Sequence, residues 1–350
     1  AIMEQVFHQV NNILGRDKTL ANEQLNIRTY EVVPLGPHAG LIEFVANSIP
    51  LHKILIDLHI NDPVEFRQAR HLMKSVQNKS GDEKLKVYRS ITKQIKPQFH
   101  KFFFKSFLDP DAWYKSKKKY IKSVATSSIV GHMLGLGDRH LNNLLVDSST
   151  GEVIHIDLGI AFDQGRLLSI PELVPFRLTR DMVDGFGITG VDGLFRENCE
   201  KVYSALRTNR EKLMCVLNIL KWDPLYSWVM SPVRKHKHLL EFDDTDEGLT
   251  PVKKHKHLLE FDDTDEGLTP SSAVTPNRRT LSLASKKTNV FNVSVNEDSE
   301  NKEAQRALKT VEEKLTAYGL SVEATVQELV QQATDEANLA VIFCGWTPFY

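Results

Sequence analysis

Two short segments carry the side chains best suited to chemistry. Residues 137–143 read Gly-Asp-Arg-His-Leu-Asn-Asn, and residues 153–159 read Val-Ile-His-Ile-Asp-Leu-Gly. Asp138 and Asn143 belong to the first segment, and Asp157 follows the apolar run of the second. Phosphoryl transfer needs a carboxylate near the attacking hydroxyl and oxygen ligands that hold Mg²⁺ against the phosphates. The two segments therefore predict a phosphoryl-transfer site.

The arrangement of these segments makes the prediction specific. Asp138 and Asn143 are five residues apart, which is the spacing between the catalytic Asp and the metal-holding Asn of protein kinases. Residues 144–146 and 153–156 are apolar and a glycine-containing turn joins them, so we expect a β-hairpin that ends just before Asp157. A lone Asp-Arg-His is usually a surface turn, but the combination of spacing and hairpin is not.

A long helix is predicted before the first segment. Asp109 and Pro110 form a strong start, because Asp caps the first turn and Pro suits the first helical position. Its apolar face is expected to lie in the core and contains Tyr120, Ile121, Val124, Ala125, Ile129 and Met133. Its lysines occupy the other faces, at positions 115, 117, 118, 119 and 122. We expect a solvated face there, with steering of a substrate as the alternative.

Apolar periodicity predicts the remaining elements. Helices are expected over residues 2–14, 62–98 with a break at Ser80-Gly81, 192–230, 302–317 and 321–333, and after Asp335. Residues 27–35 and 40–45 predict a second hairpin. The chain closes on an apolar tip made of Ile342, Phe343, Trp346, Phe349 and Tyr350. Because exposing such a cluster is costly, we expect it to pack back on the domain, or else to meet a partner or a membrane.

Composition and charge exclude other classes of protein. The 350 residues contain 44 Lys and Arg against 45 Asp and Glu, so the formal net charge is −1 and binding of nucleic acid through bulk positive charge is excluded. No run of apolar residues approaches the roughly 18 that a membrane-spanning helix needs. The three cysteines are scattered, which predicts a reducing compartment and no disulfide framework.

The first segment also carries a family resemblance. Its Asp-Arg-His order reverses the His-Arg-Asp of ordinary protein kinases and resembles the phosphatidylinositol-3-kinase-related protein kinase family. Residues 123–138 and 174–191 are similar to the ATM branch of that family, and the end of the chain resembles its FATC segment. The resemblance covers about residues 1–230 and 300–350.

The resemblance implies a role for each polar residue of the site. Asp138 would orient or deprotonate the substrate hydroxyl, and His140 would contact the transferring phosphate. Asn143 and Asp157 would hold Mg²⁺, with Mn²⁺ as an alternative, against ATP. Residues 155–179 would form the activation loop.

The resemblance also implies an ATP pocket. Residues 42–45 match the hinge that holds adenine and are Ile42, Glu43, Phe44 and Val45. Phe44 stands where the family often has Trp, and its ring can still stack on a purine. Leu145 and Ile156 would form the floor of the pocket. The alternative for these apolar residues is an ordinary place in the core.

The implied fold is α+β, a two-lobed PI3K-like protein kinase fold with a mostly helical large lobe and a helical C-terminal FATC segment. We expect four parts. Residues 1–50 are the remainder of the small lobe with the hinge, and residues 51–230 are the large lobe, with catalytic loop 135–143 and activation loop 155–179. Residues 231–300 are a duplicated and disordered regulatory linker, and residues 301–350 are a helical tail with the FATC segment at about 318–350. The family's glycine-rich loop and strand lysine would lie upstream of Ala1. The small lobe is therefore expected to be incomplete in this chain, and the chain inactive by itself.

The implied function is a serine/threonine protein kinase that uses ATP and Mg²⁺ and phosphorylates Ser or Thr followed by Gln. Its implied setting is the nucleus, in the response to DNA double-strand breaks and in telomere maintenance. Implied partners are protein substrates, the rest of the parent chain with its helical solenoid and FAT region, a second copy in a homodimer, and a break-sensor complex. Direct binding of nucleic acid by this region and binding to membranes are not expected.

Two other functions remain open, a phosphoinositide lipid kinase and a non-catalytic interaction domain with a kinase fold. Residues 157–180 contain three basic residues, Arg166, Arg177 and Arg180, which is few for binding an inositol phosphate headgroup. The complete set of Asp138, Asn143 and Asp157 argues against a non-catalytic domain.

Residues 233–251 and 252–270 form a tandem repeat with a single difference, and residues 270–300 are rich in Ser, Thr and Asn. Both features predict a flexible linker.

In the full-length protein we expect limited proteolysis to cut first within residues 231–300, because exposed flexible backbone fits a protease cleft. Deletion of residues 252–270 is expected to leave activity and melting temperature nearly unchanged. A large loss of stability would show instead that the repeat is packed.

Overall fold

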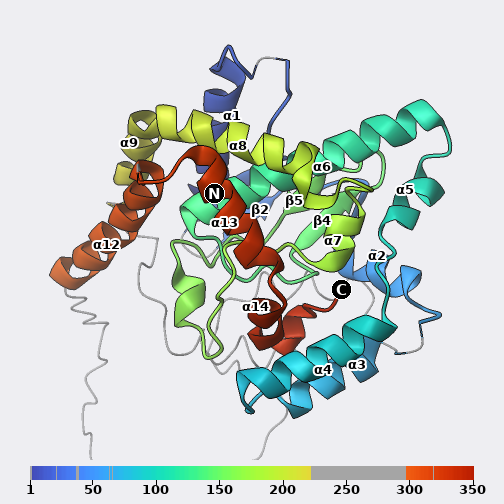
Figure 1. Cartoon of the computed structure of the whole chain (residues 1–350). Helices are drawn as coiled ribbons and strands as arrows, with labels where there is room; N and C mark the ends of the chain where they lie inside the picture. Colours follow the sequence, from blue (N-terminus) through green and yellow to red (C-terminus); the bar gives the residue numbers. More distant parts are fainter. Residues whose placement is uncertain are drawn as a thin grey trace, which may run out of the picture.

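The protein is mostly helical, with two small antiparallel sheets (Figure 1). The computed structural model describes residues 2–20, 22–36, 39–62, 64, 66–221, 297–317 and 319–350. The tandem repeat and nearly all of the predicted linker lie outside these residues. Within the described part of the chain, no helix has both the length and the apolar character needed to cross a bilayer.

Helix α6, Pro110–Leu134, runs through the middle of the fold, and α8, Leu194–Thr208, packs along it (Figure 1). It begins as predicted, because Oδ2 of Asp109 accepts a hydrogen bond from the backbone N of Ala112 at 2.8 Å and a proline occupies the first position. The six apolar residues of its predicted core face are all buried. The core therefore fixes the helix that leads into the catalytic loop.

Helix α6 ends at Gly135, where the backbone has a φ of 59°. A Cβ at this position would also lie 2.2 Å from the backbone N of Asp163, so both conformation and space require glycine. This close approach lets Asp163 N donate to the Gly135 carbonyl at 3.0 Å and Phe162 N donate to the Leu134 carbonyl at 2.7 Å. The early part of the predicted activation loop is thus held against the end of α6.

Three short strands form one sheet: β3 (Ser48–Pro50), β4 (Leu144–Asp147) and β5 (Val153–His155). The β4–β5 pair confirms the first predicted hairpin. The sequence did not predict β3, because three residues that end in proline are too few to show an alternating pattern. The second predicted hairpin is confirmed with shorter strands, as β1 (Val32–Gly36) paired with β2 (Ala39–Ile42), because residues 27–31 and 43–45 are not strand.

Shorter helices surround α6: α1 (Ile2–Arg16), α2 (Leu51–Leu58), α3 (Phe66–Ser75), α4 (Gly81–Gln94), α5 (His100–Ser106), α7 (Arg180–Asp184) and α9 (Arg210–Leu220). The break predicted at Ser80 separates α3 from α4, and the Ser80 hydroxyl accepts a hydrogen bond from Glu83 N in a capping box. The predicted helical region 192–230 contains α8 and α9, and its residues 222–230 lie outside the described part. Helices α2 and α5 were not predicted, since eight and seven residues carry little periodicity.

The tail contains the three predicted helices, α12 (Glu297–Thr316), α13 (Val322–Thr334) and α14 (Glu336–Val341). They pack on α9, α8 and α4 respectively, so the tail lies along the large lobe (Figure 1). Helix α12 begins at Glu297, inside the range predicted as linker, which corrects that boundary.

The aromatic tip of the chain is buried against the large lobe. Trp346 is 3% exposed, and Phe349 and Tyr350 are 0% exposed. The buried guanidinium of Arg177 donates to the carbonyls of Trp346 at 2.6 Å and of Thr347 at 3.2 Å. This burial confirms that the tip packs back on the domain, and Arg177 connects it to the end of the activation loop.

A buried histidine lies beside the tip. His59 Nδ1 is 2.6 Å from Oδ2 of Asp62 and His59 Nε2 is 3.1 Å from Oδ1 of Asp181, while its ring meets that of Tyr350 edge-on at 4.6 Å. Because both nitrogens face carboxylates, the ring donates twice as an imidazolium. Burial lowers the pKa of His59, but the hydrogen bonds to Asp181 and Asp62 outweigh it and raise the pKa above the usual 6.5.

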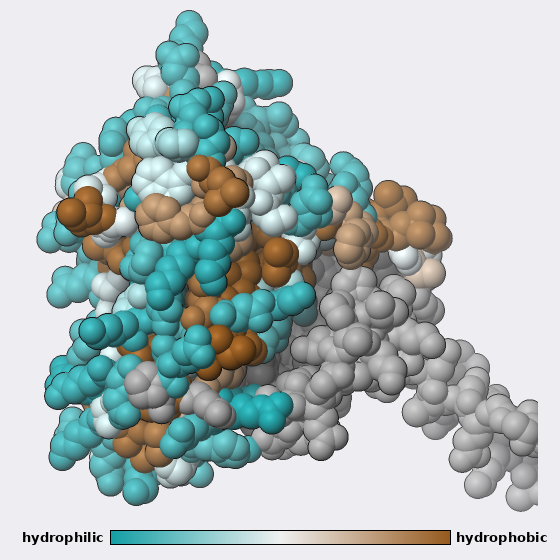
Figure 2. Space-filling view, turned by 90° about the vertical axis from the view of Figure 1, so that its right-hand side faces the viewer, coloured by the Kyte–Doolittle hydropathy of each residue, from teal (hydrophilic) through white to brown (hydrophobic). Residues whose placement is uncertain are grey.

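The face that carries α5 and the start of α6 is hydrophilic with separate apolar patches (Figure 2). Phe104 is exposed and stacks on Trp113, and Nζ of Lys117 lies 4.9 Å from the centre of the Trp113 ring. Lys115, Lys118 and Lys119 of the same helix are exposed, as predicted for a solvated face. Lys117 is half-buried and the Lys122 side chain is only 12% exposed and pairs with Glu23, so the prediction is wrong for Lys122.

Replacement of Trp346 by Ala is expected to destabilise the full-length protein by about 3–5 kcal/mol, the usual cost of truncating a buried tryptophan. Because loss of this buried side chain displaces the tip, and with it the backbone carbonyls that accept from Arg177, we also expect lower activity and faster hydrogen exchange in residues 302–343 and 155–179 together. Leu320→Ala, at a half-exposed tail position, is the control and should change neither. If exchange rose in the tail alone while activity held, the tip would not brace the loop.

The stability that His59 supplies is expected to depend on pH. Its folded pKa is raised, so this stability is complete below the unfolded pKa of about 6.5 and is lost as the pH rises through the folded pKa. His59→Gln leaves two carboxylates without their cation and should cost on the order of 3 kcal/mol at pH 6. Melting temperatures of both proteins at pH 6, 7 and 8 should therefore converge as the pH rises. A constant difference would refute a charged His59.

Candidate active site

Arg139 joins the predicted catalytic loop to the start of the predicted activation loop. The residue is 3% exposed, and its Nε donates to the Gly137 carbonyl at 2.7 Å. Its two terminal nitrogens donate to the carbonyls of Ile156, at 2.8 Å, and of Asp157. Burial lowers the pKa of Arg139, while nearby carboxylates, first those of Asp138 and Asp157, oppose that shift. One guanidinium thus fixes the predicted catalytic Asp relative to the predicted metal ligand.

Asp138 and His140 face each other at the mouth of this loop. His140 Nε2 lies 3.9 Å from Oδ2 of Asp138, and both side chains are about 15% exposed, so solvent and substrate can reach them. His140 Nδ1 accepts a hydrogen bond from Asn142 N at 3.2 Å. In the neutral ring the proton must therefore sit on Nε2, the nitrogen that faces Asp138. The pair can hold a hydroxyl and offer it both an acceptor and a donor.

Asn143 directly precedes strand β4 and Asp157 follows strand β5, as predicted, so both lie at the open end of this hairpin. Asn143 is 6% exposed, and its Nδ2 donates to the Asp138 carbonyl at 2.9 Å, so Oδ1 is the amide atom that could bind a metal ion. The Asn143 carbonyl accepts a hydrogen bond from Ile156 N at 3.0 Å, so the two segments run together, and Asp157 itself is exposed.

This donor set fits Mg²⁺. Among the described residues there is no cluster of three or more His, Cys, Asp or Glu side chains that could hold a metal. Mg²⁺ commonly binds through one or two protein oxygens while phosphates and water complete its shell. Asn143 and Asp157 are the predicted pair of this kind, and a nucleotide would supply the remaining ligands.

The structure brings three of the six predicted ATP-binding residues together. Val45, Leu145 and Ile156 belong to one apolar cluster, in which Val45 and Leu145 are each 9% exposed. Ile42, Glu43 and Phe44 do not join the cluster, and Phe44 is 73% exposed. The residues predicted as the floor of the pocket thus lie together, most of the predicted hinge lies at the surface, and the binding of ATP by these residues stays a prediction.

Sequence reasoning missed Tyr30 and Glu4. Tyr30 belongs to the same apolar cluster, and burial, followed by the charge of Glu4, raises the pKa of its phenol. Glu4 accepts a hydrogen bond from Tyr30 N at 3.4 Å, and its other carboxylate oxygen is buried without a partner among the described residues. Burial raises the pKa of Glu4 to about 7. Glu4 does not share the period of the apolar residues of the first helix, so nothing in the sequence signalled its burial.

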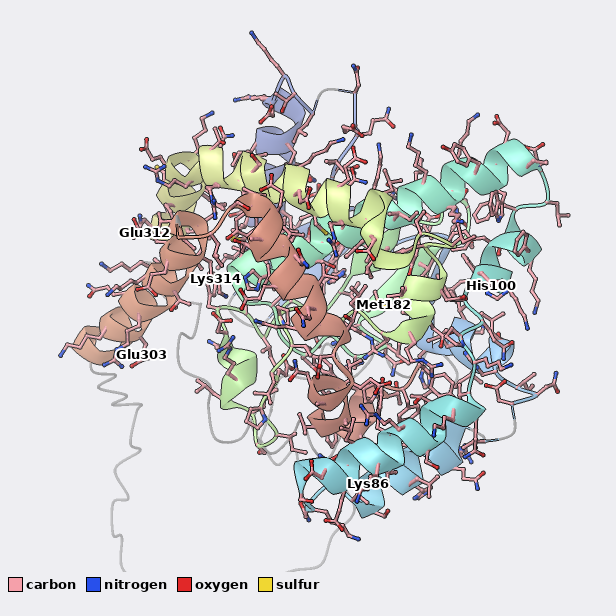
Figure 3. All side chains as sticks on the ribbon, in the orientation of Figure 1. Lys86, His100, Met182, Glu303, Glu312 and Lys314 are labelled. Carbon is pink, nitrogen blue, oxygen red and sulfur yellow. The ribbon has the colours of Figure 1, made fainter. Side chains whose placement is uncertain are left out.

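The tail also reaches the edge of the site. Lys314, near the end of α12 (Figure 3), donates to the His132 carbonyl at 2.9 Å and to Oδ2 of Asp163 at 2.7 Å. Burial and the Lys314 charge lower the pKa of His132 to about 3. Nothing in the local sequence marks this contact, because its partners are more than 150 residues away.

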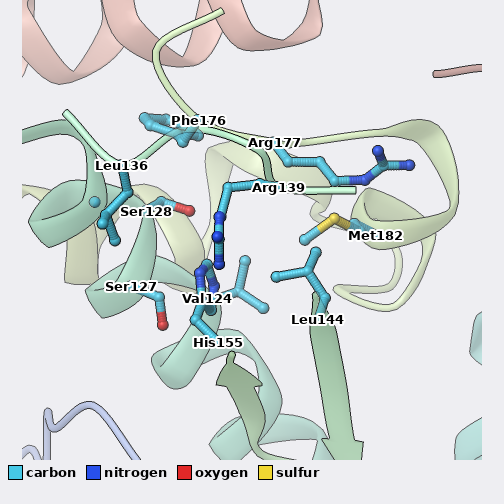
Figure 4. Close-up of a pocket in the computed structure, with 11 residues that line it drawn as sticks. Val124, Ser127, Ser128, Leu136, Arg139, Leu144, His155, Phe176, Arg177 and Met182 are labelled. Atoms are coloured by element: carbon cyan, nitrogen blue, oxygen red, sulfur yellow. The ribbon is translucent and has the colours of Figure 1, made fainter. Parts of the chain in front are cut away.

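A cavity lies behind the catalytic loop, with Arg139, His155, Ser127 and Ser128 among its lining residues (Figure 4). Its volume of about 10 Å³ is enough for roughly one water molecule and far too small for a nucleotide. This cavity is therefore separate from the nucleotide site.

Comparison with known proteins identifies relatives across the whole chain. A family model described as phosphatidylinositol 3- and 4-kinase matches residues 1–230, and a FATC domain model matches residues 319–350. Serine/threonine-protein kinase TEL1 of Saccharomyces cerevisiae is 59% identical over the whole chain, which spans 11% of that protein. The TEL1 protein of Kluyveromyces lactis is 54% identical, and the chain spans 12% of it.

Solved structures agree. The FAT and kinase domain of CtTel1 has a TM-score of 0.79 at 38% identity, with all of this chain and 21% of that chain covered. A Tel1 kinase butterfly symmetric dimer has a TM-score of 0.78 at 57% identity, with all of this chain and 12% of that chain covered. The chain therefore belongs to the phosphatidylinositol 3- and 4-kinase family, in which it is similar to the Tel1 protein kinases, and it carries a FATC domain at residues 319–350.

Proposed function

We propose that this chain is the catalytic region of a serine/threonine protein kinase that uses ATP with Mg²⁺, or Mn²⁺. One observation carries the proposal: the buried Arg139 holds the segments of Asp138 and Asp157 together, and Asn143 bonds to the Asp138 backbone between them. These are the residue types that phosphoryl transfer to a hydroxyl requires. Relatives named serine/threonine-protein kinase support the same activity.

Each residue has a distinct task in this proposal. Asp138 accepts the hydrogen bond of the substrate hydroxyl and orients its oxygen, and His140 Nε2 donates to the transferring phosphate. Bound Mg²⁺ would neutralise charge on the phosphates. Asn143 and Asp157 would hold that ion, and Val45, Leu145 and Ile156 would cover one side of the adenine.

The wider role is proposed from the relatives. We propose phosphorylation of Ser or Thr followed by Gln, in the nuclear response to DNA double-strand breaks and in telomere maintenance. The proposed partners are the rest of the parent chain, a second copy of it, and a break-sensor complex. A related structure described as a symmetric Tel1 dimer supports the second copy.

The structure favours a protein substrate over a phosphoinositide. Of the three arginines in residues 157–180, Arg177 is buried against the tail and Arg180 donates to the Ile95 carbonyl. Arg166 is exposed, so this segment offers one exposed arginine. A lipid headgroup that carries phosphates needs a denser basic surface.

Asp157→Asn in the full-length protein should lower kcat by at least roughly 100-fold, because it removes a charge from the metal ion that stabilises the transferring phosphate. The melting temperature should change little, since Asp157 is exposed. Asp192→Asn, at an exposed carboxylate that pairs with Arg196, is the control and should retain full activity. Turnover of Asp157→Asn within twofold of the unaltered protein would contradict the metal assignment.

Substrate class is tested with two panels. The full-length protein should phosphorylate peptides with Gln after Ser or Thr faster than matched peptides with Ala there. It should leave phosphatidylinositol in vesicles unmodified, because residues 157–180 offer little positive charge. Phosphorylation of the lipid alone would favour the lipid-kinase alternative, and phosphorylation of neither the peptides nor the lipid would favour a non-catalytic domain.

A further inference from the structure

The carboxylate of Glu172, in the activation loop, contacts the backbone of the catalytic loop. Oε1 of Glu172 accepts a hydrogen bond from the backbone N of Asp138 at 2.6 Å. The bond is charge-assisted and short, which places it among the stronger hydrogen bonds in proteins. It joins the residue proposed to orient the substrate hydroxyl to a loop residue that lies 34 positions later in the sequence.

Two glycines make room for this carboxylate. A Cβ at Gly137 would lie 2.7 Å from Oε2 of Glu172, and a Cβ at Gly165 would lie 2.3 Å from the same atom. Neither glycine has a positive φ, so space rather than backbone conformation explains them. The Gly165 carbonyl also accepts a hydrogen bond from Glu172 N at 3.2 Å. The Glu172 carboxylate thus packs between Gly137 of the catalytic loop and Gly165 of the activation loop.

The backbone that Glu172 contacts is strained. Asp138 has a φ of 56°, a conformation that costs a residue other than glycine free energy and persists only when its surroundings enforce it. The N–H of Asp138 is held by Glu172, and its carbonyl is held by Nδ2 of Asn143 at 2.9 Å. Side chains therefore bind the peptide groups on both sides of this residue.

We propose that Glu172 is a positioning residue, which fixes the backbone of Asp138 in its productive conformation only when the activation loop is seated. This inference rests on the proposed kinase function, because it assigns Glu172 to the same site. Movement of residues 165–172 would release the N–H of Asp138 and let its backbone relax. The Asp138 carboxylate would then no longer point at the substrate hydroxyl. The order of the activation loop would thereby set turnover.

A second role for Glu172 must be separated from this one. Its charge also acts on the buried Arg139, after the larger effects of Asp138 and Asp157. Glutamine at position 172 has the same shape and an amide oxygen that can accept the Asp138 N–H, but it has no charge. Comparison of alanine with glutamine therefore distinguishes a hydrogen bond from charge balance.

The test measures kcat and KM for ATP in the full-length protein. Glu172→Ala should lower kcat by roughly 10-fold to 100-fold, the range expected for losing a hydrogen bond to a charged group, with KM for ATP within about twofold. Glu172→Gln should restore most of kcat. Glu313→Ala, at an exposed carboxylate of α12, is the control and should match the unaltered protein.

Gly165→Ala provides an independent variant that keeps Glu172 itself. The added methyl group must displace the carboxylate, so kcat should fall as in Glu172→Ala. The double variant should be no slower than the slower single variant, because both remove the same contact. Additive losses would overturn the proposal, as would a Glu172→Gln protein as slow as Glu172→Ala.

Hydrogen exchange of the peptide that contains the Asp138 amide gives a readout apart from activity. Exchange there should rise in Glu172→Ala and in Gly165→Ala and stay unchanged in Glu172→Gln. If Asp138→Asn is inactive while Glu172→Ala keeps full kcat and protected exchange, the role of Glu172 is refuted and the kinase function stands. If Asp138→Asn keeps full activity, the proposed function fails, and exchange still decides whether Glu172 holds the loop.

Discussion

The buried guanidinium of Arg139 is the interaction on which the candidate site depends. Its donors bond to three carbonyls, those of Gly137, Ile156 and Asp157, and the charge is balanced at a distance by carboxylates. A buried cation is costly unless hydrogen bonds satisfy it, so the chain cannot separate these segments without leaving the charge unpaired. This constraint, rather than any single strand or helix, holds the catalytic and activation loops in register.

A second buried arginine, Arg177, also donates to backbone carbonyls, at the other end of the activation loop. Arg177 donates to the carbonyls of Trp346 and Thr347, and burial lowers the pKa of Arg177 to about 9. Because its partners are backbone carbonyls, a change of tail side chains alone would not remove them, whereas displacement of the tail would. The activation loop is therefore held between two buried cations, with Glu172 contacting the catalytic loop in the middle.

The part of the site that could be predicted from sequence is the part with local structure. Asp138 and Asn143 share one loop and Asp157 follows the adjoining hairpin, so spacing alone indicated that they meet. Tyr30 and Lys314 could not be found in this way, because each meets the site through contacts distant in sequence and neither lies in a recognisable motif. The fold shows the same division. The long helices were predicted, whereas α2, α5 and β3 are too short to show a period, so only packing against the rest of the fold stabilises them. The interpretation of residues 42–44 as a hinge remains a prediction, since their exposure shows neither a nucleotide contact nor its absence.

The contacts of the tail make it part of the catalytic fold rather than an appendage. Lys314 joins Asp163 and the His132 carbonyl, and the Tyr203 hydroxyl donates to the Lys314 carbonyl at 2.7 Å, so α12 is bound to both α6 and α8. Removal of the tail would leave these polar groups, and those around Arg177, without their partners, at a cost of about 1–3 kcal/mol for each that stays buried. Asp163 lies where the activation loop meets the end of α6, and its backbone bonds to Gly135. Displacement of the tail would therefore first disturb the loop that contains Glu172, because Lys314 and Arg177 connect the tail to both ends of that loop.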